Sequence, residues 1–270
     1  MKLTIAHATE YRYEQPVSYV VQRLRLRPMD GPTQKVLNWS VLVDGKPAET
    51  GYGDQYCNQV ALMSLQGNTQ AVRIVARGEV ETIDTAGVYG AHQGFTPLWL
   101  FLRHTPRTEP GQRVRDLVQR IGGEDDISRM HALMNTINSE VAYLPGTTDS
   151  DTTAEQALEA KSGVCQDHAH IFIAAARSLG IPARYVSGYL LMDGVVEQVA
   201  THAWAEVHLP NLGWAGFDPA NNVCPDERYV RIATGMCYHD CAPIAGVRIG
   251  PTNENLTVSV TVARAGSQQQ

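Results

Sequence analysis

The sequence has no apolar run of the roughly 18 residues that a membrane span requires. Its N-terminus also lacks the apolar core of a signal peptide, so we expect a cytoplasmic protein with no membrane partner. Cysteine is scarce, with five in 270 residues. That odd number, without close paired spacing, fits reduced thiols better than a disulfide framework. Basic residues are outnumbered, 22 against 28 acidic ones, which argues against a nucleic-acid partner.

The sequence contains no binding motif for calcium or for an organic cofactor. No clustered carboxylate loop of the calcium-binding type occurs, and no organic cofactor is implied, so we expect none. A structural zinc site is the alternative, because four soft or borderline ligands lie near the C-terminal end. Their spacing matches no common zinc knuckle, and we therefore expect no metal. These four residues are Cys224, Cys237, His239 and Cys241.

Apolar residues make up 43% of the chain, which is ample for a core. Residues 1–85 form short β-rich runs separated by Gly, Asp and Pro turns, the pattern of a small β-sandwich. Residues 86–110 carry Gly, Pro and aromatic residues with weak periodicity, and are predicted to connect two domains. Residues 111–264 form the second domain with a C-terminal strand, and 265–270 form a tail. We expect the connector's aromatic residues to pack: Phe95, Trp99 and Phe101.

The segment 161–191 predicts a loop, a helix, a turn and a strand. Gly180 supplies a C-terminal cap for the helix, and Pro182 prevents its continuation. Cys165 falls in the first turn, where unpaired backbone N–H groups and the positive end of the helix dipole favour thiolate over thiol. Thiolate is the nucleophilic form. The helix itself is predicted from apolar residues at the 3.6 period: Cys165, Ala169, Phe172, Ala176 and Leu179.

A cysteine nucleophile needs a base, and the base needs a group that orients it. Residues 199–209 alternate as a strand and place His202 on its polar face. A short turn leads to a second strand, 214–218. If the two strands pair about residue 210 or 211, Asp218 lies opposite His202 or diagonal to it. Cys165, His202 and Asp218, in this order along the chain, can therefore lie together in one site.

His168 is a rival base, because it lies three residues after Cys165 and so neighbours it on the helix surface. We prefer His202, since it alone comes with an orienting carboxylate at strand-pairing distance.

The segments GVCQDHAHIFIAAARSLGIPARYVSGYL and THAWAEVHLPNLGWAGFDPANN resemble the bacterial transglutaminase-like superfamily, whose core is papain-like. By that resemblance Cys165 is the nucleophile, His202 the general base and acid, and Asp218 the orienting carboxylate. The opening YRYEQPVSYVVQRLRLRP resembles the N-terminal β-domain of one branch, which includes candidate cysteine proteases. The expected fold is α+β: an N-terminal β-sandwich, then a papain-like core whose cysteine helix packs on an antiparallel sheet.

Residues around the cysteine have expected supporting roles. Asp167 and His170 belong to the resembled CxDxAH pattern. Asp167 lies in the first turn, where the helix dipole stabilises a carboxylate, so we expect structural support. His170 is not on the face of Cys165 and is expected to be a buried hydrogen-bonding residue. The backbone N–H of Cys165 is a plausible oxyanion donor, with Gln166 a weaker one.

Two aromatic residues have either a site role or a plain packing role. Trp204 shares a face with His202 and would shield the site from water, although a core tryptophan explains it almost as well. Tyr143 precedes the cysteine helix in a segment similar to one in the resembled branch, and either lines the cleft or packs in a loop. Relatives tend to carry Arg-Asp where this chain has Met236-Cys237, which puts substrate preference in doubt.

The predicted chemistry is acyl transfer on a peptide or carboxamide through a thioester on Cys165. Water as acceptor makes a peptidase or amidase, and a primary amine makes a transglutaminase. We favour hydrolysis, because choosing an amine over water demands a dedicated acceptor tunnel that the sequence does not reveal. The expected partner is a peptide or protein substrate. A non-catalytic peptide-binding scaffold is the alternative of another class, disfavoured because all three residues are present.

Overall fold

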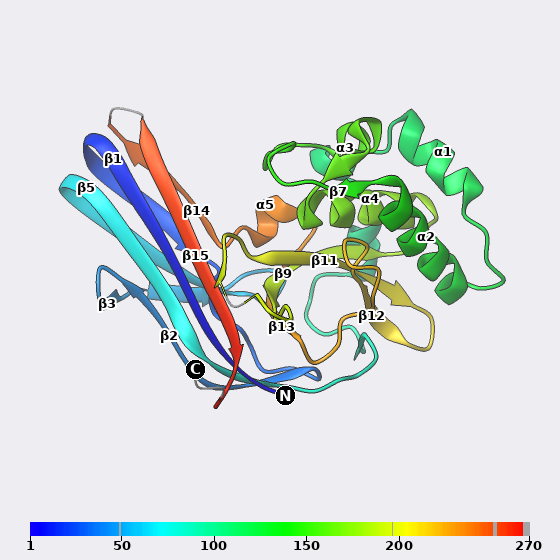
Figure 1. Ribbon diagram of the computed structural model, residues 1–270, viewed down its shortest axis with the longest axis horizontal. Coiled ribbons are helices and arrows are strands. Elements are labelled where there is room, and N and C mark those ends of the chain that lie inside the picture. The colour runs from blue at the N-terminus through cyan, green and yellow to red at the C-terminus, as the bar shows by residue number, and fades with distance from the viewer. Residues whose placement is uncertain (49, 196, 251–252, 267–270) are drawn as a thin grey trace.

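The structure is a computed structural model that describes residues 1–48, 50–195, 197–250 and 253–266. The end of the predicted tail, 267–270, lies outside the described residues. Figure 1 shows a strand layer on one side and a helical region on the other. Among the described helices, none is both long and apolar enough to cross a membrane.

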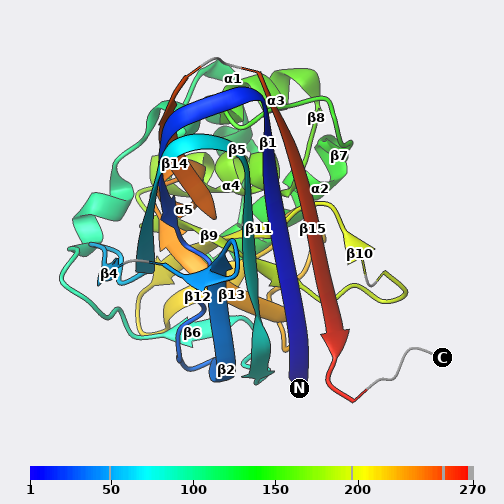
Figure 2. The same cartoon turned by 90° about the vertical axis from the view of Figure 1, so that its left-hand side faces the viewer.

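Two long strands form the N-terminal half: β1 (Lys2–Leu24) and β5 (Gln59–Thr82), which pair antiparallel along most of their length. The register shifts between Arg12 and Tyr19, and both strands curve over there (Figure 2). The two arms of the curved sheet enclose an apolar interior that includes Val20, Val72 and Ile74. The predicted N-terminal β-sandwich is thus confirmed. Its remaining strands are β2 (Gln34–Val43), β3 (Lys46–Pro47) and β4 (Thr50–Gly53).

The chain returns to this sheet at its C-terminal end. Strands β14 (Ile244–Ile249) and β15 (Glu254–Arg264) both pair antiparallel with β1, and β10 (Glu197–Gln198) pairs with β15. The sequence prediction placed residues up to 264 in the second domain, and the structure differs here. β1 pairs with β5 along one edge only, so its other edge offers unpaired backbone groups that β14 and β15 satisfy.

The second half is built on a five-stranded sheet in the order β13-β9-β11-β12-β6, with antiparallel neighbours. The helix α4 (Cys165–Ser178) packs on this sheet and is buried along nearly its whole length. The prediction of a cysteine helix on an antiparallel sheet is therefore confirmed. The strands are β6 (Val88–Gly90), β9 (Ala183–Leu190), β11 (His202–Leu209), β12 (Gly213–Phe217) and β13 (Tyr229–Gly235).

Short elements cover the other sides of α4. Helices α1, α2 and α3 contact α4 directly, and α5 lies against β9 and β13. A two-stranded parallel pair, β7 with β8, leads the chain into α4. The bounds are η1 (Leu98–Leu102), η2 (Pro106–Thr108), α1 (Gln112–Arg120), α2 (Asp126–Glu140), β7 (Ala142–Tyr143), α3 (Ala154–Ala160), β8 (Ser162–Gly163) and α5 (Tyr238–Cys241).

One apolar core joins the two halves. It contains Leu3 and Ile5 of β1 and Val260 of β15 together with the buried face of α4. The connector packs less than predicted. Phe101 is buried, but Phe95 and Trp99 are 79% and 60% exposed, so the expectation that all three pack was wrong. Trp99 lies in the short 3-10 helix η1, which buries only one of its five side chains.

Candidate active site

Cys165 is the first residue of α4, and its position depends on the turn before the helix. The Asp167 carboxylate accepts hydrogen bonds from the Val164 N–H at 2.8 Å and from the Thr148 hydroxyl at 2.7 Å. A side chain at Gly163 would not fit, because a Cβ there would lie 2.6 Å from Asp167 Oδ2. This buried cap fixes the helix start, where the N–H groups of the first turn have no carbonyl partner inside the helix.

His202 begins β11 and contacts Asp218, which follows β12. His202 Nε2 lies 2.7 Å from Asp218 Oδ2. His208 pairs with Trp214 and Ala205 with Phe217, so the strands pair about residue 211. This register places Asp218 diagonal to His202, the second of the two predicted arrangements.

Asp218 is fully buried and accepts several hydrogen bonds besides that of His202. Tyr229 donates its hydroxyl to Oδ2 at 2.8 Å, and the Asn221 side chain donates to the same oxygen at 2.7 Å. The backbone N–H of Ala220 donates to Oδ1 at 3.0 Å. Burial alone would raise the pKa of Asp218, but these hydrogen bonds and the imidazole hold it below its ordinary value. The carboxylate therefore stays ionised beside His202.

Cys165 is the second partner of His202. Burial lowers the pKa of His202, but the Cys165 thiolate and Asp218, through charge and hydrogen bonding, raise it to about 10. Since Nε2 faces Asp218, Nδ1 is the ring nitrogen left for the thiol. The arrangement gives Cys165 a neighbouring imidazole that a buried carboxylate orients.

Two aromatic side chains border this group. Tyr143 lies against Cys165, and burial together with the charge of the Cys165 thiolate raises the Tyr143 pKa to about 12. Its hydroxyl therefore keeps its proton near neutral pH. Trp204 is buried, and its ring stacks with that of His202 at a centroid distance of 6.3 Å. Both residues thus lie where the sequence prediction gave them a possible site role.

The other histidines of α4 are engaged elsewhere. His168 Nδ1 lies 2.9 Å from the Val164 carbonyl and Nε2 lies 3.0 Å from the Val141 carbonyl. Both ring nitrogens face backbone oxygens, which argues against His168 as the base. His170 is fully buried and accepts the Tyr238 N–H at 3.1 Å. Burial lowers the pKa of His170 to about 3, so it is neutral in the folded protein.

The remaining predicted residues are not part of one cluster. Gln166 donates its side-chain amide to the Asp149 carbonyl at 3.3 Å, in the loop before α3. The described residues contain no group of three or more His, Cys, Asp or Glu side chains arranged to hold a metal ion, so the possible zinc ligands do not form such a group. Cys241 instead donates its thiol to the Tyr185 carbonyl.

Sequence reasoning missed Asn221 and Tyr229. Asn221 had a local signal, because Asn three residues after Asp in DPANN is typical of a turn closed on the Asp side chain. Tyr229 had none, since it comes from a strand beyond a separate loop.

Fold and site together define a class of protein: an α+β protein with a cysteine at a helix N-terminus and a histidine–carboxylate pair on the adjoining sheet. Residues 115–219 match the family model of the transglutaminase-like superfamily, and residues 3–81 match that of the bacterial transglutaminase-like N-terminal region. The chain belongs to this superfamily. Cys165, His202 and Asp218 all fall within the first match.

Relatives of known sequence extend over the whole chain or over the core alone. An uncharacterised protein of Mycobacterium leprae is 29% identical over 97% of this chain and 99% of its own. A protein-glutamine gamma-glutamyltransferase of Pseudomonas aeruginosa is 35% identical over 36% of this chain and 16% of its own. A crystal structure of a candidate cysteine protease from Cytophaga hutchinsonii has a TM-score of 0.80 and 24% identity, and covers 100% of this chain and 92% of that chain. This last likeness shows the shared fold.

Proposed function

We propose that the protein is a thiol-dependent acyltransferase that hydrolyses an amide bond of a peptide or protein. The observation that carries the proposal is the contact of one imidazole with both Cys165 and the buried Asp218. A scaffold that only bound peptides would not need an ionised carboxylate held by an imidazole and four further donors in the same place.

The first half-reaction forms a thioester. The Cys165 thiolate attacks the carbonyl carbon, a C–S bond forms, and the carbonyl electrons move to oxygen. We assign the backbone N–H of Cys165 and the Tyr143 hydroxyl, which lies against Cys165, as the donors that stabilise that oxygen. Collapse breaks the C–N bond, and the proton on His202 Nδ1 goes to the leaving amine. Asp218 keeps the ring oriented throughout.

The second half-reaction transfers the acyl group. His202, now neutral, takes a proton from the acceptor as the acceptor attacks the thioester, and the thiolate leaves. Water as acceptor gives a carboxylic acid, and a primary amine gives a new amide. We propose water, because Tyr143, which lies against Cys165, is 53% exposed, so solvent reaches this border of the site. The relative in Pseudomonas aeruginosa, named as a glutamyltransferase, favours the amine as second candidate.

The test digests a mixture of synthetic peptides of defined sequence, with and without a primary amine in excess, and identifies the products by mass spectrometry. Wild-type protein should cleave peptides or deamidate glutamine, and the amine should be incorporated only in a minority of products. Cys165→Ala should abolish turnover, whereas Cys57→Ala, which removes an exposed cysteine away from the site, should not. Equal activity of the Cys165→Ala protein would refute the proposal, and amine incorporation as the main product would favour the transglutaminase.

A further inference from the structure

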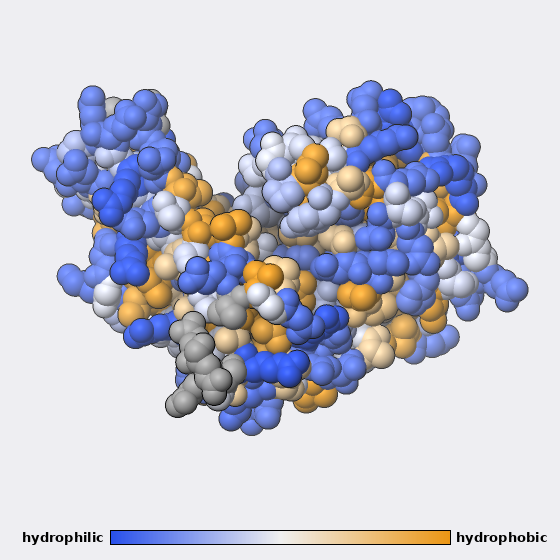
Figure 3. Space-filling view, in the orientation of Figure 1, coloured by the Kyte–Doolittle hydropathy of each residue, from blue (hydrophilic) through white to orange (hydrophobic). Residues whose placement is uncertain are grey.

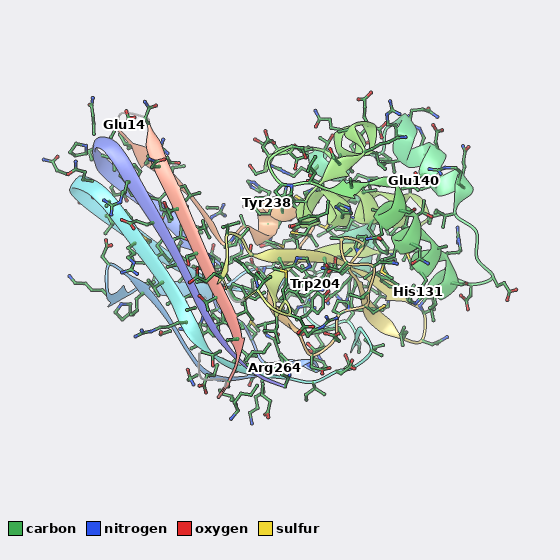
Figure 4. All side chains as sticks on the ribbon, viewed as in Figure 1. Glu14, His131, Glu140, Trp204, Tyr238 and Arg264 are labelled. Atoms are coloured by element: carbon green, nitrogen blue, oxygen red, sulfur yellow. The ribbon has the colours of Figure 1, made fainter. Side chains whose placement is uncertain are left out.

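A cavity of about 180 Å³ lies between the N-terminal sheet and the second half of the chain. Figure 3 shows the molecule hollowed on this side, with apolar side chains along the strand wall. Figure 4 shows Tyr238, the first residue of α5, on the opposite wall. The cavity thus has one wall from each half of the protein.

The lining combines apolar residues with a few neutral polar ones, and among the described residues it carries no charged side chain. Leu256 and Val258 of β15, Val199 and Tyr238 contribute apolar surface, and no Lys, Arg, Asp or Glu belongs to the lining. The polar floor is internally satisfied, because Nδ1 of His7 hydrogen bonds with the Tyr189 hydroxyl at 2.9 Å and Nε2 with the hydroxyl of Thr9 at 3.1 Å. Such a cavity favours an apolar group and offers nothing to a charged one.

The cavity adjoins the candidate active site. Thr201, one of its lining residues, directly precedes His202. On the other side, the Tyr238 ring lies 6.3 Å from that of Tyr185, and burial, followed by the charge of a Cys165 thiolate, raises the pKa of Tyr185. The cavity therefore lies beside the start of β11, the strand that carries His202.

We propose that this cavity binds one apolar side chain, of leucine or phenylalanine size, of the peptide substrate near the bond that is attacked. The inference rests on the proposed function and names a substrate preference for it. A dry cavity of about 150 Å³ is enough to hold a benzene ring, so the volume suits one such side chain. Val199 and Leu256 are 85% and 53% exposed, and an apolar occupant would remove that surface from water.

The first experiment compares cleavage of peptides that carry Leu, Phe, Ala or Glu at each position around the cleaved bond. We expect enrichment of Leu and Phe at one fixed position. Leu256→Asp should lower kcat/KM for the apolar peptides by about 10- to 100-fold, the range for a lost apolar pocket contact. The matched control is Val247→Asp. Val247 is 69% exposed on the neighbouring strand β14, outside the cavity lining, and its substitution should leave the preference unchanged.

The second experiment needs no turnover. In Cys165→Ala protein, Val199→Cys is equilibrated with disulfide fragments that carry isobutyl, phenyl or carboxyl groups, and conjugation at residue 199 is read by peptide mass spectrometry. Isobutyl and phenyl fragments should conjugate about tenfold more than the carboxyl fragment, and Val247→Cys should show no such preference. Conjugation without preference at residue 199 overturns the inference.

The two experiments separate the two proposals. If peptides are cleaved without an apolar preference, the cavity is refuted as a substrate site while the proposed function stands. The same follows if the Leu256→Asp protein keeps the apolar preference of wild type. Apolar preference at residue 199 without cleavage of any peptide refutes the proposed function and leaves an apolar binding site.

Discussion

At the scale of single residues, several hydrogen bonds together hold the Asp218 carboxylate that orients His202. Tyr229→Phe removes one donor to Asp218 Oδ2 and little else, because the ring stays packed on Trp204. A hydrogen bond to a charged group contributes about 1.5 to 3 kcal/mol, so we expect kcat to fall about tenfold or more. The pKa of Asp218 should rise toward its ordinary value, and activity should be lost at a higher pH on the acid side. Steady-state kinetics between pH 4 and 8 measure both effects.

The control for this variant is Tyr189→Phe, which removes another buried hydroxyl, one that hydrogen bonds with His7 rather than with the site. It should leave the acid side of the activity profile in place. A Tyr229→Phe profile that coincides with that of wild type would show that Asp218 does not depend on this donor.

The contact between Cys165 and His202 can be tested by the reactivity of the Cys165 thiol at low pH. Burial lowers the pKa of His202, but the charge of a Cys165 thiolate and Asp218 raise it to about 10, and Cys165 also begins α4 at the positive end of the helix dipole. We therefore expect iodoacetamide to alkylate Cys165 at pH ~6, where an ordinary thiol, with a pKa of about 8.5, reacts slowly. His202→Ala should remove this reactivity and His168→Ala should keep it. Peptide mass spectrometry reads all five cysteines in one sample, and the reverse result for the two histidines would assign the base to His168.

Tyr143 combines exposure with contact to the thiol. Tyr143→Phe removes the hydroxyl while the ring remains, so stability should change by less than about 0.5 kcal/mol, as for surface substitutions. If the hydroxyl stabilises the oxyanion, kcat should fall about 10²- to 10³-fold with KM nearly unchanged. An equal loss in kcat and in alkylation rate would instead assign Tyr143 to activation of the thiol.

At the scale of elements, the start of α4 depends on one buried carboxylate. Asp167→Ala removes the acceptor of both the Val164 N–H and the Thr148 hydroxyl, which should destabilise the protein by about 1 to 3 kcal/mol. Asp167→Asn keeps an acceptor oxygen, so this variant should lose less stability than Asp167→Ala. Burial raises the pKa of Asp167, so the neutral amide also avoids part of the cost of burying a charge. Urea denaturation of both variants measures the difference, and equal losses would contradict the capping role.

The contact between β1 and β9 is sensitive to acid. Burial lowers the pKa of His7 to about 4, whereas an unfolded histidine titrates at about 6.5. Its neutral form stabilises the fold above pH 6.5, and this contribution is lost as pH falls from 6.5 toward 4. The loss reaches about 2 kcal/mol at pH 5 by linkage. His7→Gln should be less stable than wild type at pH 7 and should show a smaller decrease at pH 5. Parallel stability profiles of the two proteins would exclude this assignment.

At the scale of the whole molecule, local sequence patterns predicted those features that short segments determine by themselves. Cys165, His202 and Asp218 could be placed because a helix start and a two-strand hairpin fix them within short segments. Tyr229 could not, since its strand reaches Asp218 only through the order of the sheet. The pairing of β15 with β1 was also beyond the sequence, because any β-rich run can satisfy an open strand edge, and the choice depends on how the intervening chain folds.

That pairing implies that the two halves unfold together. Ile5 of β1 is fully buried in the core that contains α4, so Ile5→Ala should cost about 2 to 5 kcal/mol. Because the core is shared, hydrogen exchange of the slowest amides should speed up equally in α4 and in β5. Ile74→Ala, inside the β-sandwich interior, should give the same uniform response if unfolding is cooperative. Faster exchange confined to β5 in either variant would show that the second half holds its structure alone, and that the strands returning from its C-terminal end only attach the sandwich to it.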